Sequence, residues 1–190
     1  MIRMIDLERD GMSCWWWYNW YITHSTATFE TEPVSSHDFN ERIRTIRKKY
    51  PWIVLEDDEK LLGYAYLNRF NPRAAYNWTA DLSIYLSPDQ CGKGYGRMLM
   101  KEIIDLAKKD GYHNIASLIT GNNTASMKLH ESFGFVKTGT YQNFGYKDNT
   151  WLDVSYYVLK LCDPDPNVIP EQPKNLNPYE EVKPHRVPVQ

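Results

Sequence analysis

The feature that most constrains this chain is a glycine-rich segment, Gln90-Cys91-Gly92-Lys93-Gly94-Tyr95-Gly96-Arg97. It follows an alternating apolar and polar run at 82–86 and precedes an amphipathic helical pattern at 98–109. Glycine at every second position lets a backbone approach a ligand with no Cβ in the way. The helix dipole and unpaired N–H groups favour an anion at the N-terminus of the following helix. The segment therefore predicts a pyrophosphate-binding loop, and a glycine-rich turn that binds nothing is the alternative.

Spacing within the segment excludes two other phosphate loops. A Walker A loop needs Lys and then Ser or Thr after its second glycine, whereas Gly94 is followed by Tyr95. The dinucleotide fingerprint needs a third glycine at the position of Arg97. The segment instead resembles the Q/R-x-x-G-x-G/A loop that binds coenzyme A in the GNAT family of acetyl-CoA-dependent N-acetyltransferases.

A second motif lies in the block Asn123-Thr124-Ala125-Ser126-Met127-Lys128-Leu129-His130-Glu131-Ser132-Phe133-Gly134-Phe135. It resembles the N-x-x-S-x-x-L-(Y/H)-x-x-x-G-F pattern of the same family. Asn123 is expected to cap a short helix over 125–132, which Gly134 ends in the left-handed conformation. One-turn spacing places Ser126 on the face of Asn123, and His130 follows about two turns from Asn123. Taken alone, His130 would fit a hydrogen-bonded core histidine, but its place in the block favours a functional one.

Further segments resemble one branch of the family, the phosphinothricin acetyltransferases and the related methionine sulfone or sulfoximine acetyltransferases. They lie at 18–22, 25–33, 73–81 and 139–154, so the resemblance covers roughly residues 1–161. It implies an α+β domain with the GNAT fold, in which helices flank a central mixed, largely antiparallel sheet. It also implies acetyl-CoA as the cosubstrate and a homodimer.

The same resemblance identifies the coenzyme site. The amide-rich pantetheine arm of coenzyme A is expected to pair like an added strand beside residues 84–86. The N–H of Leu86 would then donate to the thioester carbonyl, and more strongly to the oxyanion. Lys93 or Arg97 would add positive charge to the backbone N–H groups of the loop. The expected coenzyme-binding residues are Ile84, Tyr85, Leu86, Gln90, Cys91, Gly92, Lys93, Gly94, Tyr95, Gly96, Arg97, Asn123 and Ser126.

Two side chains are candidates for proton transfer while an amine attacks the thioester directly in a ternary complex. Asp81 would take the proton of the amine, directly or through a water. Relatives in this branch carry Glu there, and the shorter Asp favours the water; an exposed strand-end carboxylate is the alternative. His130 would donate a proton to the coenzyme A thiolate, or only hydrogen-bond the sulfur or hold a water.

The expected acceptor site follows the pattern of the branch. Arg73 would pair with a carboxylate of the acceptor, and Phe29, Thr31, Tyr76 and Trp151 would wall a small pocket. An arginine often found near residue 77 in this branch is missing, so small amino acids and related amines stay open beside phosphinothricin, methionine sulfone and methionine sulfoximine. Acetylation of a protein N-terminus or an aminoglycoside is an alternative, as is a non-catalytic acetyl-CoA-binding module.

Composition bounds the partners and the compartment. A net charge of −2 over 190 residues gives no electrostatic reason to expect nucleic acid or an anionic membrane as partner. No apolar run approaches the roughly 20 residues of a membrane span, and the N-terminus lacks signal-peptide features. Three widely spaced cysteines suggest no disulfide framework, and the five histidines show no metal-ligand spacing. We expect a cytoplasmic enzyme without a metal.

One domain is expected over 1–162, followed by a proline-rich extension over 163–190 that holds seven of the eleven prolines. The aromatic cluster at 15–21 indicates core packing, or else a wall of the acceptor pocket or a dimer face. The extension is either solvated or a strap over the domain or a neighbouring subunit. Apolar residues that a strap could bury are Val168, Ile169, Leu176, Tyr179 and Val187. Strands are predicted at 2–7, 52–55, 61–67, 79–86, 115–119, near 135–141 and at 153–160. Helices are predicted from the end of the first strand to about residue 26, and at 35–50, 98–109 and 125–132.

Overall fold

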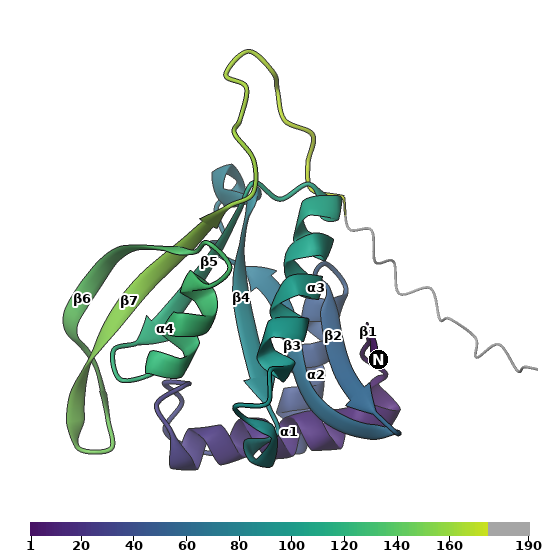
Figure 1. Ribbon diagram of the computed structural model, residues 1–190, viewed down its shortest axis with the longest axis vertical. Coiled ribbons are helices and arrows are strands. Elements are labelled where there is room, and N and C mark those ends of the chain that lie inside the picture. The colour runs from purple at the N-terminus through teal and green to yellow at the C-terminus, as the bar shows by residue number, and fades with distance from the viewer. Residues whose placement is uncertain (175–190) are drawn as a thin grey trace, which may run out of the picture.

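A mixed sheet forms the centre of the molecule in the computed structural model, which describes residues 1–174 (Figure 1). Its strand order is β1-β2-β3-β4-β5-β7-β6, and every neighbouring pair is antiparallel except β4 and β5. The strands are β1 (Ile2–Met4), β2 (Trp52–Asp57), β3 (Lys60–Arg69), β4 (Thr79–Leu86), β5 (Asn114–Thr120), β6 (Val136–Lys147) and β7 (Thr150–Lys160). This architecture confirms the predicted α+β class with a largely antiparallel sheet.

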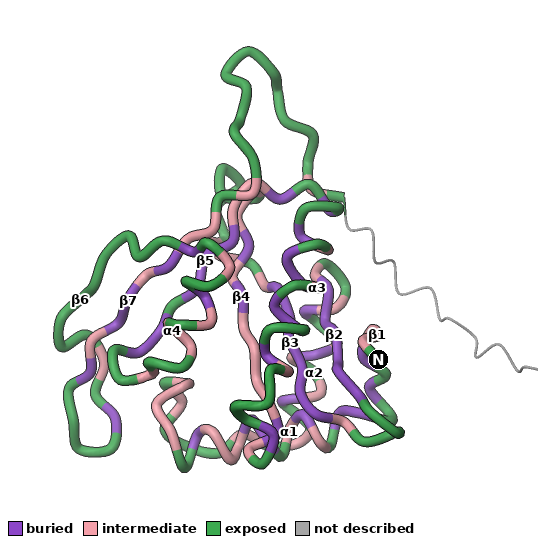
Figure 2. Tube along the Cα trace, in the orientation of Figure 1, coloured by how far each residue is buried: buried purple, intermediate pink, exposed green. Residues whose placement is uncertain are grey.

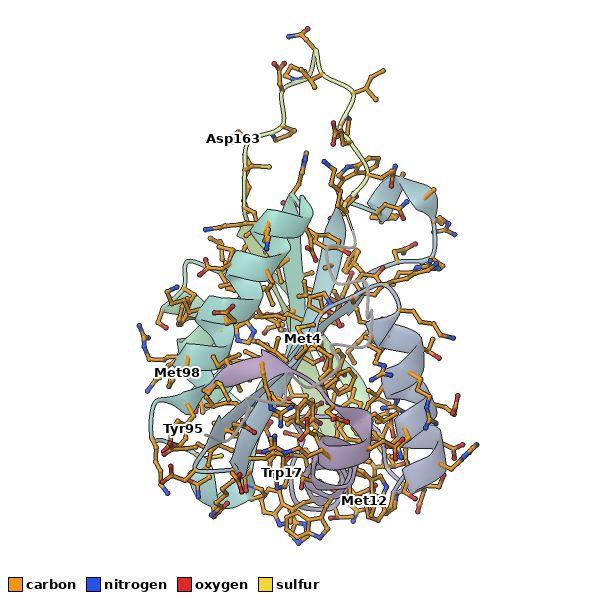
Figure 3. All side chains as sticks on the ribbon, turned by 90° about the vertical axis from the view of Figure 1, so that its right-hand side faces the viewer. Met4, Met12, Trp17, Tyr95, Met98 and Asp163 are labelled. Atoms are coloured by element: carbon orange, nitrogen blue, oxygen red, sulfur yellow. The ribbon has the colours of Figure 1, made fainter. Side chains whose placement is uncertain are left out.

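Helices cover both faces of the sheet, as Figure 3 shows for α2 and α3 on opposite sides. The helices are α1 (Leu7–His24), α2 (Ser36–Arg47), α3 (Tyr95–Asp110) and α4 (Thr124–Glu131), with short 3-10 turns at Ala74–Tyr76 and Pro88–Gln90. Helices α1 and α2 pack on one face and α3 on the other, where α4 adds its apolar side chains. The predicted cap of α4 is confirmed, because the side chain of Asn123 accepts a hydrogen bond from Ser126 N.

Alternation along the strands divides the core into two layers. In β2, Ile53 and Leu55 point toward α3, whereas Trp52 and Val54 point toward α1 and α2. The ring of Trp52 stacks on that of Tyr66 with centroids 4.1 Å apart. Each such side chain contributes about 1.5–3 kcal/mol by leaving water. The aromatic cluster at 15–21 supplies Trp17 and other residues to the second layer, which confirms core packing for part of it.

Several element boundaries differ from the sequence-based prediction for local reasons. The first strand stops at Met4 because Asp6 caps α1 by accepting hydrogen bonds from Glu8 N and Arg9 N. Strand β6 runs on to Lys147 because β7 pairs with it up to the turn at 148–149. Both turn residues, Asp148 and Asn149, adopt positive φ, which suits a tight hairpin.

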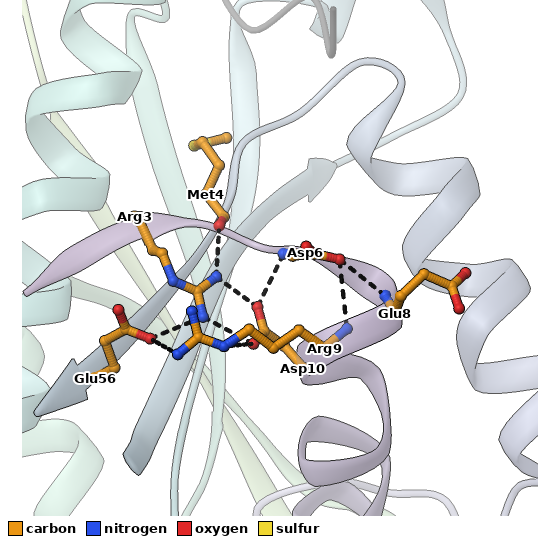
Figure 4. A network of polar contacts seen from close by, with 7 residues as sticks. All are labelled: Arg3, Met4, Asp6, Glu8, Arg9, Asp10 and Glu56. Atoms are coloured by element: carbon orange, nitrogen blue, oxygen red, sulfur yellow. Dashed lines mark hydrogen bonds and ion pairs between the residues drawn. The ribbon is translucent and has the colours of Figure 1, made fainter. Parts of the chain in front are cut away.

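A buried charge network ties β1, α1 and β2 together (Figure 4). The guanidinium of Arg3 donates to both carboxylate oxygens of Asp10, at 2.6 and 2.8 Å, and to Glu56 at 2.9 Å. Arg9 adds a contact of 2.9 Å to Glu56, and Asp6 N donates to Asp10. Asp10 is fully buried, so the pair is shielded from water and salt. Hydrogen bonds from Arg3 lower the pKa of Glu56.

The described part of the C-terminal extension contacts the domain through Asp163, which pairs with Lys160 of β7, and again near its end. Trp78 Nε1 donates to Glu171 O at 2.7 Å, and Lys174 N donates to Asp110 O at 2.7 Å. The residues before these form a protruding loop, which Figure 2 colours as exposed at the top of the view. Val168 and Ile169 are 60% and 93% exposed, so they do not pack against the domain of their own chain. The other apolar residues named for the strap, Leu176, Tyr179 and Val187, lie outside the described residues.

Candidate active site

A cavity of about 500 Å³ opens where strands β4 and β5 separate. The two strands pair only from Thr79↔Asn114 to Asp81↔Ala116, and beyond this point side chains from both faces of the sheet line the cavity. The lining residues include the following: Tyr21, Ala27, Leu82, Ser83, Ile84, Tyr85, Leu86, Cys91, Gly92, Gly94, Gly96, Arg97, Ser117, Leu118, Ile119, Thr120, Asn123, Ala125, Ser126, Leu129 and His130. The predicted loop and the predicted α4 block therefore meet at one site, although Gly96 and Asn123 lie 27 positions apart in the sequence.

The glycine loop has the open geometry that an anion needs. Gly92 and Gly94 have φ of 79° and 87°, and an added Cβ at either position would meet no atom within 4 Å. Gly94 is the N-cap of α3, so the N–H groups of its first turn begin at this loop. Gly96 has a second role, because a Cβ there would lie 3.2 Å from Leu129 Cδ2 of α4. The residues present fit a pyrophosphate group at the N-terminus of α3.

The place of Gln90 requires a correction. Its side chain is buried, accepts a hydrogen bond from Lys93 Nζ at 3.0 Å and donates to Asp89 at 2.7 Å, and it does not line the cavity. Gln90 stands four residues before Gly94, whereas the Gln or Arg of the coenzyme motif stands three before, a position that Cys91 occupies here. Cys91 does line the cavity. Gln90 thus stabilises the loop through its hydrogen bonds with Asp89 and Lys93 and does not face the cavity.

The two candidate cations of the loop also differ in placement. Arg97 lines the cavity, with Nη1 donating to Ser132 Oγ at 2.8 Å and the guanidinium 5.0 Å from the ring centre of Phe133. Lys93 is held by Gln90 and is absent from the lining, as is Tyr95, which packs against the core. Of the two cations, the structure brings Arg97 to the cavity.

The open edge of β4 offers a ligand backbone groups that no neighbouring strand pairs with. Ser87 N donates to Leu62 O, and from the next pair, Gly63↔Leu86, the register of β3 and β4 continues without a bulge. In an antiparallel ladder hydrogen-bonded and non-hydrogen-bonded pairs alternate, so the backbone N–H and C=O groups of Ile84 and Leu86 face away from β3. They face the side where β5 has already separated, and both residues line the cavity. This edge can pair with an extended amide-bearing chain.

Tyr21 of α1 is a cavity residue that the sequence analysis did not name as a site residue. Its hydroxyl donates to Leu86 O at 3.0 Å and lies 3.5 Å from Cys91 Sγ. Burial raises the pKa of this hydroxyl, which stays protonated and can remain a donor. No local pattern points to this contact, because the two residues lie 65 positions apart.

Asp81 is the last residue of β4 that pairs with β5. By alternation it shares a face with Tyr85, which packs against Tyr18 of α1, so Asp81 lies on the α1 and α2 side of the sheet. Among the described residues, its buried Oδ1 has no hydrogen-bond partner. Burial raises the pKa of the carboxyl to about 7. The structure thus excludes the alternative of an ordinary exposed carboxylate, and Asp81 precedes the cavity residue Ser83 by two positions on the same face.

His130 lies across the cavity on α4 and is buried. Its Nδ1 lies 2.8 Å from Ser126 O, and its Nε2 lies 3.1 Å from the Oγ of Ser117 on β5. Burial lowers the pKa of the imidazole. Asn123 and Ser126 line the same cavity, as their one-turn spacing predicted. Ser117 was not predicted as a site residue.

None of the five residues expected around the acceptor lines the 500 Å³ cavity. Phe29 packs on Gly145, where an added Cβ would lie 2.1 Å from its ring. Trp151 pairs with Tyr146, so alternation places it on the other face of the hairpin, 59% exposed. Thr31 is exposed. Arg73 and Tyr76 are exposed at the turn before β4.

Within residues 1–174, no helix is long and apolar enough to cross a membrane. In the same part of the chain, no group of three or more His, Cys, Asp or Glu side chains is arranged to hold a metal ion.

Comparison with known proteins identifies the class that this fold and cavity define. A family profile described as an acetyltransferase (GNAT) domain matches residues 8–155, and the chain belongs to this family of acetyltransferases. The chain is 36% identical over 138 residues to a phosphinothricin N-acetyltransferase of Alcaligenes faecalis, covering 72% of this chain and 70% of that one. It is 31% identical over 148 residues to an L-methionine sulfoximine/L-methionine sulfone acetyltransferase of Salmonella typhimurium, with 76% and 85% covered.

Solved structures agree with this assignment. A phosphinothricin acetyltransferase from Sinorhizobium meliloti in complex with acetyl-CoA superposes with a TM-score of 0.82 at 30% identity, covering 90% of this chain and 95% of the other. An N-acetyltransferase from Staphylococcus aureus superposes with a TM-score of 0.83 at 35% identity, covering 85% and 98%.

Proposed function

We propose that this protein transfers the acetyl group of acetyl-CoA to the amino group of a small amino-acid-like acceptor of the phosphinothricin, methionine sulfone or methionine sulfoximine type. The amine attacks the thioester directly in a ternary complex. The observation that carries this proposal is the cavity, which joins an open glycine loop to an unpaired strand edge. The names of the relatives support the class of acceptor.

The chain's own residues would bind and orient the coenzyme. The loop around Gly92 and Gly94 receives the pyrophosphate, with Arg97 adding charge. The backbone groups of Ile84 and Leu86 pair with the pantetheine amides, and one of their N–H groups polarises the acetyl carbonyl. When bound, acetyl-CoA supplies the activated acetyl group. Tyr21 holds Leu86 O, which fixes the orientation of the strand end.

Asp81 is proposed as the base that takes a proton from the amine. A carboxyl with a pKa of about 7 is a stronger base than an ordinary aspartate, yet it is largely ionised above neutral pH. His130 is proposed to act in protonating the leaving sulfur, because it lines the cavity on the opposite side of the sheet from Asp81. Base and acid would thus approach the thioester from different faces.

The test is release of free thiol from acetyl-CoA across a panel of amines, with calorimetry of acetyl-CoA binding in parallel. Turnover with methionine sulfoximine, methionine sulfone or phosphinothricin but not with aminoglycosides or a peptide N-terminus would support the proposal. Turnover restricted to aminoglycosides or the peptide would favour those alternatives. Coenzyme binding without turnover on any amine would favour a non-catalytic binding module.

We also propose a homodimer, supported by exposed apolar residues on the edge hairpin β6–β7; most of β6 is coloured as exposed in Figure 2. The apolar residues are Val136, Tyr141, Phe144, Tyr146 and Trp151, each more than half exposed. Exposed apolar clusters usually mark contacts, and an edge strand can pair with a second copy. Sedimentation equilibrium tests this proposal, and a monomeric mass at micromolar concentration would reject it.

The cytoplasm is the proposed compartment, with residues 1–162 as the catalytic domain and 163–190 as an extension. Cys91 carries a free thiol exposed at the coenzyme loop, which suits a reducing environment. Cell fractionation tests the location, and recovery of the protein outside the cytoplasm would reject it.

A further inference from the structure

Ser117 is a buried serine at the point where the sheet opens. Ala116 is the last residue of β5 that pairs with β4, and Ser117 follows it directly. Its side chain is buried yet lines the cavity, and its Oγ lies 3.1 Å from Nε2 of His130. Two rings also lie beside the imidazole, with centroids 4.8 Å away for Phe135 and 6.3 Å away for Tyr157. Ser117 and His130 thus line the cavity together, and Ser117 is the polar group in contact with Nε2.

The hydrogen bonds of His130 define which ring nitrogen carries hydrogen. Nδ1 lies 2.8 Å from Ser126 O and 3.3 Å from Ser126 Oγ; a carbonyl oxygen can only accept, so the shorter of these contacts assigns the hydrogen to Nδ1. In the neutral ring Nε2 then has a free lone pair and accepts the hydroxyl hydrogen of Ser117. Burial lowers the pKa of His130, which keeps this neutral form abundant near pH 7. In this state Nε2 has no proton to give to a leaving group.

We propose that Ser117 is a catalytic residue that hands a proton to the departing coenzyme A sulfur and takes its replacement from His130. When His130 is protonated, both ring nitrogens donate, Nε2–H to Ser117 Oγ, and the hydroxyl hydrogen of Ser117 is free to point into the cavity. As the carbon–sulfur bond breaks, the Oγ–H bond of Ser117 breaks toward the sulfur and Nε2–H passes its proton to Oγ. The products are a thiol, an intact serine and a neutral imidazole. This inference rests on the proposed function.

The atoms balance over the whole reaction. Acetylation of a neutral amine releases one proton, which Asp81 takes, and formation of the thiol consumes one. Solvent returns a proton to His130 and removes one from Asp81. The arrangement inferred for the neutral ring, with the Ser117 hydroxyl donating to Nε2 over 3.1 Å, is the one that remains after the proton has been delivered.

Imidazole nitrogen spectra test the hydrogen-bond arrangement without any turnover. In the full chain labelled with ¹⁵N-histidine, and with His130→Asn to assign the signals, we expect a protonated Nδ1 and an unprotonated Nε2 at pH 7.5. Coenzyme A should shift the Nε2 signal, whereas desulfo-coenzyme A, which lacks the sulfur, should leave it almost unchanged. A protonated Nε2 in the neutral ring, or equal responses to both ligands, would overturn the inference.

Kinetics test the proton transfer itself. Ser117→Ala should lower kcat by about 10- to 100-fold, while the dissociation constant of acetyl-CoA changes less than about threefold. Adding Ser117→Ala to His130→Asn should cost little more than His130→Asn alone, because both changes break one path. The control is Ser155→Ala, another buried serine, whose Oγ bonds to Thr140 on β6 and not to the cavity. It should keep kcat within about twofold of the unmodified enzyme.

The outcomes separate this inference from the function on which it rests. A kcat of Ser117→Ala equal to that of Ser155→Ala, or losses that multiply in the double variant, would remove Ser117 from the chemistry while the acetyltransferase assignment stands. If the unmodified enzyme acetylates no amine, the proposed function fails, and the nitrogen spectra with coenzyme A and desulfo-coenzyme A still decide whether Ser117 and His130 respond to the sulfur.

Discussion

At the scale of single residues, the opposite pKa shifts of Asp81 and His130 are the most informative property of the site. Burial raises the pKa of the carboxyl to about 7 and lowers the pKa of the imidazole. A base needs its ionised form, which for Asp81 is abundant only above pH 7. An imidazolium donor is abundant only below its own lowered pKa. The two required forms therefore overlap poorly whether His130 donates directly or through Ser117, so turnover should be greatest in a narrow pH range; the 3.1 Å contact of Nε2 with Ser117 Oγ is what favours the path through Ser117.

Asp81→Asn should reduce kcat by about 100-fold or more, because the amide cannot accept a proton, while acetyl-CoA affinity changes little. In the unmodified enzyme, kcat/KM for the amine should rise with pH through about 7 as Asp81 ionises. Stopped thiol-release assays from pH 5.5 to 9 measure both effects. An unchanged rate in Asp81→Asn would take this carboxyl out of the mechanism.

The same substitution has a signature in stability. Because the folded-state pKa of Asp81 lies above the unfolded value, the protonated carboxyl stabilises the fold at low pH, and this contribution is lost as pH rises from about 4 through about 7. The free energy of unfolding of Asp81→Asn, compared with that of the unmodified protein at the same pH, should therefore be higher at pH 8 than at pH 4.5. Urea titrations at the two pH values supply the comparison, and a difference of opposite sign would contradict the burial of Asp81.

At the scale of elements, the glycine loop and the N-terminal charge network show two ways in which local geometry is fixed. Gly94 has φ of 87°, a conformation that costs other residues about 1–2 kcal/mol. Gly94→Ala adds a Cβ that meets no atom within 4 Å, so the backbone conformation alone is perturbed. Because the loop is exposed and can relax, acetyl-CoA affinity should fall about tenfold. Calorimetry of acetyl-CoA binding measures this change. The control is Gly139→Ala, where an added Cβ also meets no atom and φ is not positive, and this variant should bind acetyl-CoA with unchanged affinity.

The charge network should matter more to stability than any surface ion pair. Asp10→Ala leaves Arg3 without its two closest acceptors in a buried setting, which typically costs about 3 kcal/mol. Lys101→Ala removes an exposed pair with Asp105 at 2.7 Å and should cost less than about 0.5 kcal/mol. Urea unfolding compares the two variants. Equal losses would mean that the buried network contributes no more than a surface pair.

At the scale of the whole molecule, what could be predicted follows the range of the interactions. The cap at Asn123, the left-handed Gly134 and the strand β4 are set by neighbours within a few positions, and all are found as predicted. Contacts between distant segments were missed, such as Tyr21 with Leu86 and Ser117 with His130. The acceptor residues show the same limit, because the face on which a side chain lies depends on register across the hairpin.

The extension tests how far the domain depends on chain beyond its core. Deletion of 175–190 keeps the hydrogen bonds of Glu171 and Lys174 to the domain, whereas deletion of 163–190 removes both. Two such bonds contribute about 1–3 kcal/mol together, which corresponds to a melting temperature lower by roughly 2–10 °C for the shorter protein. Turnover at 25 °C should persist in both, because the described extension contributes no residue to the cavity lining. Loss of turnover in the shorter protein, with its fold intact by circular dichroism, would assign the extension a part in the site and reject a boundary near residue 162.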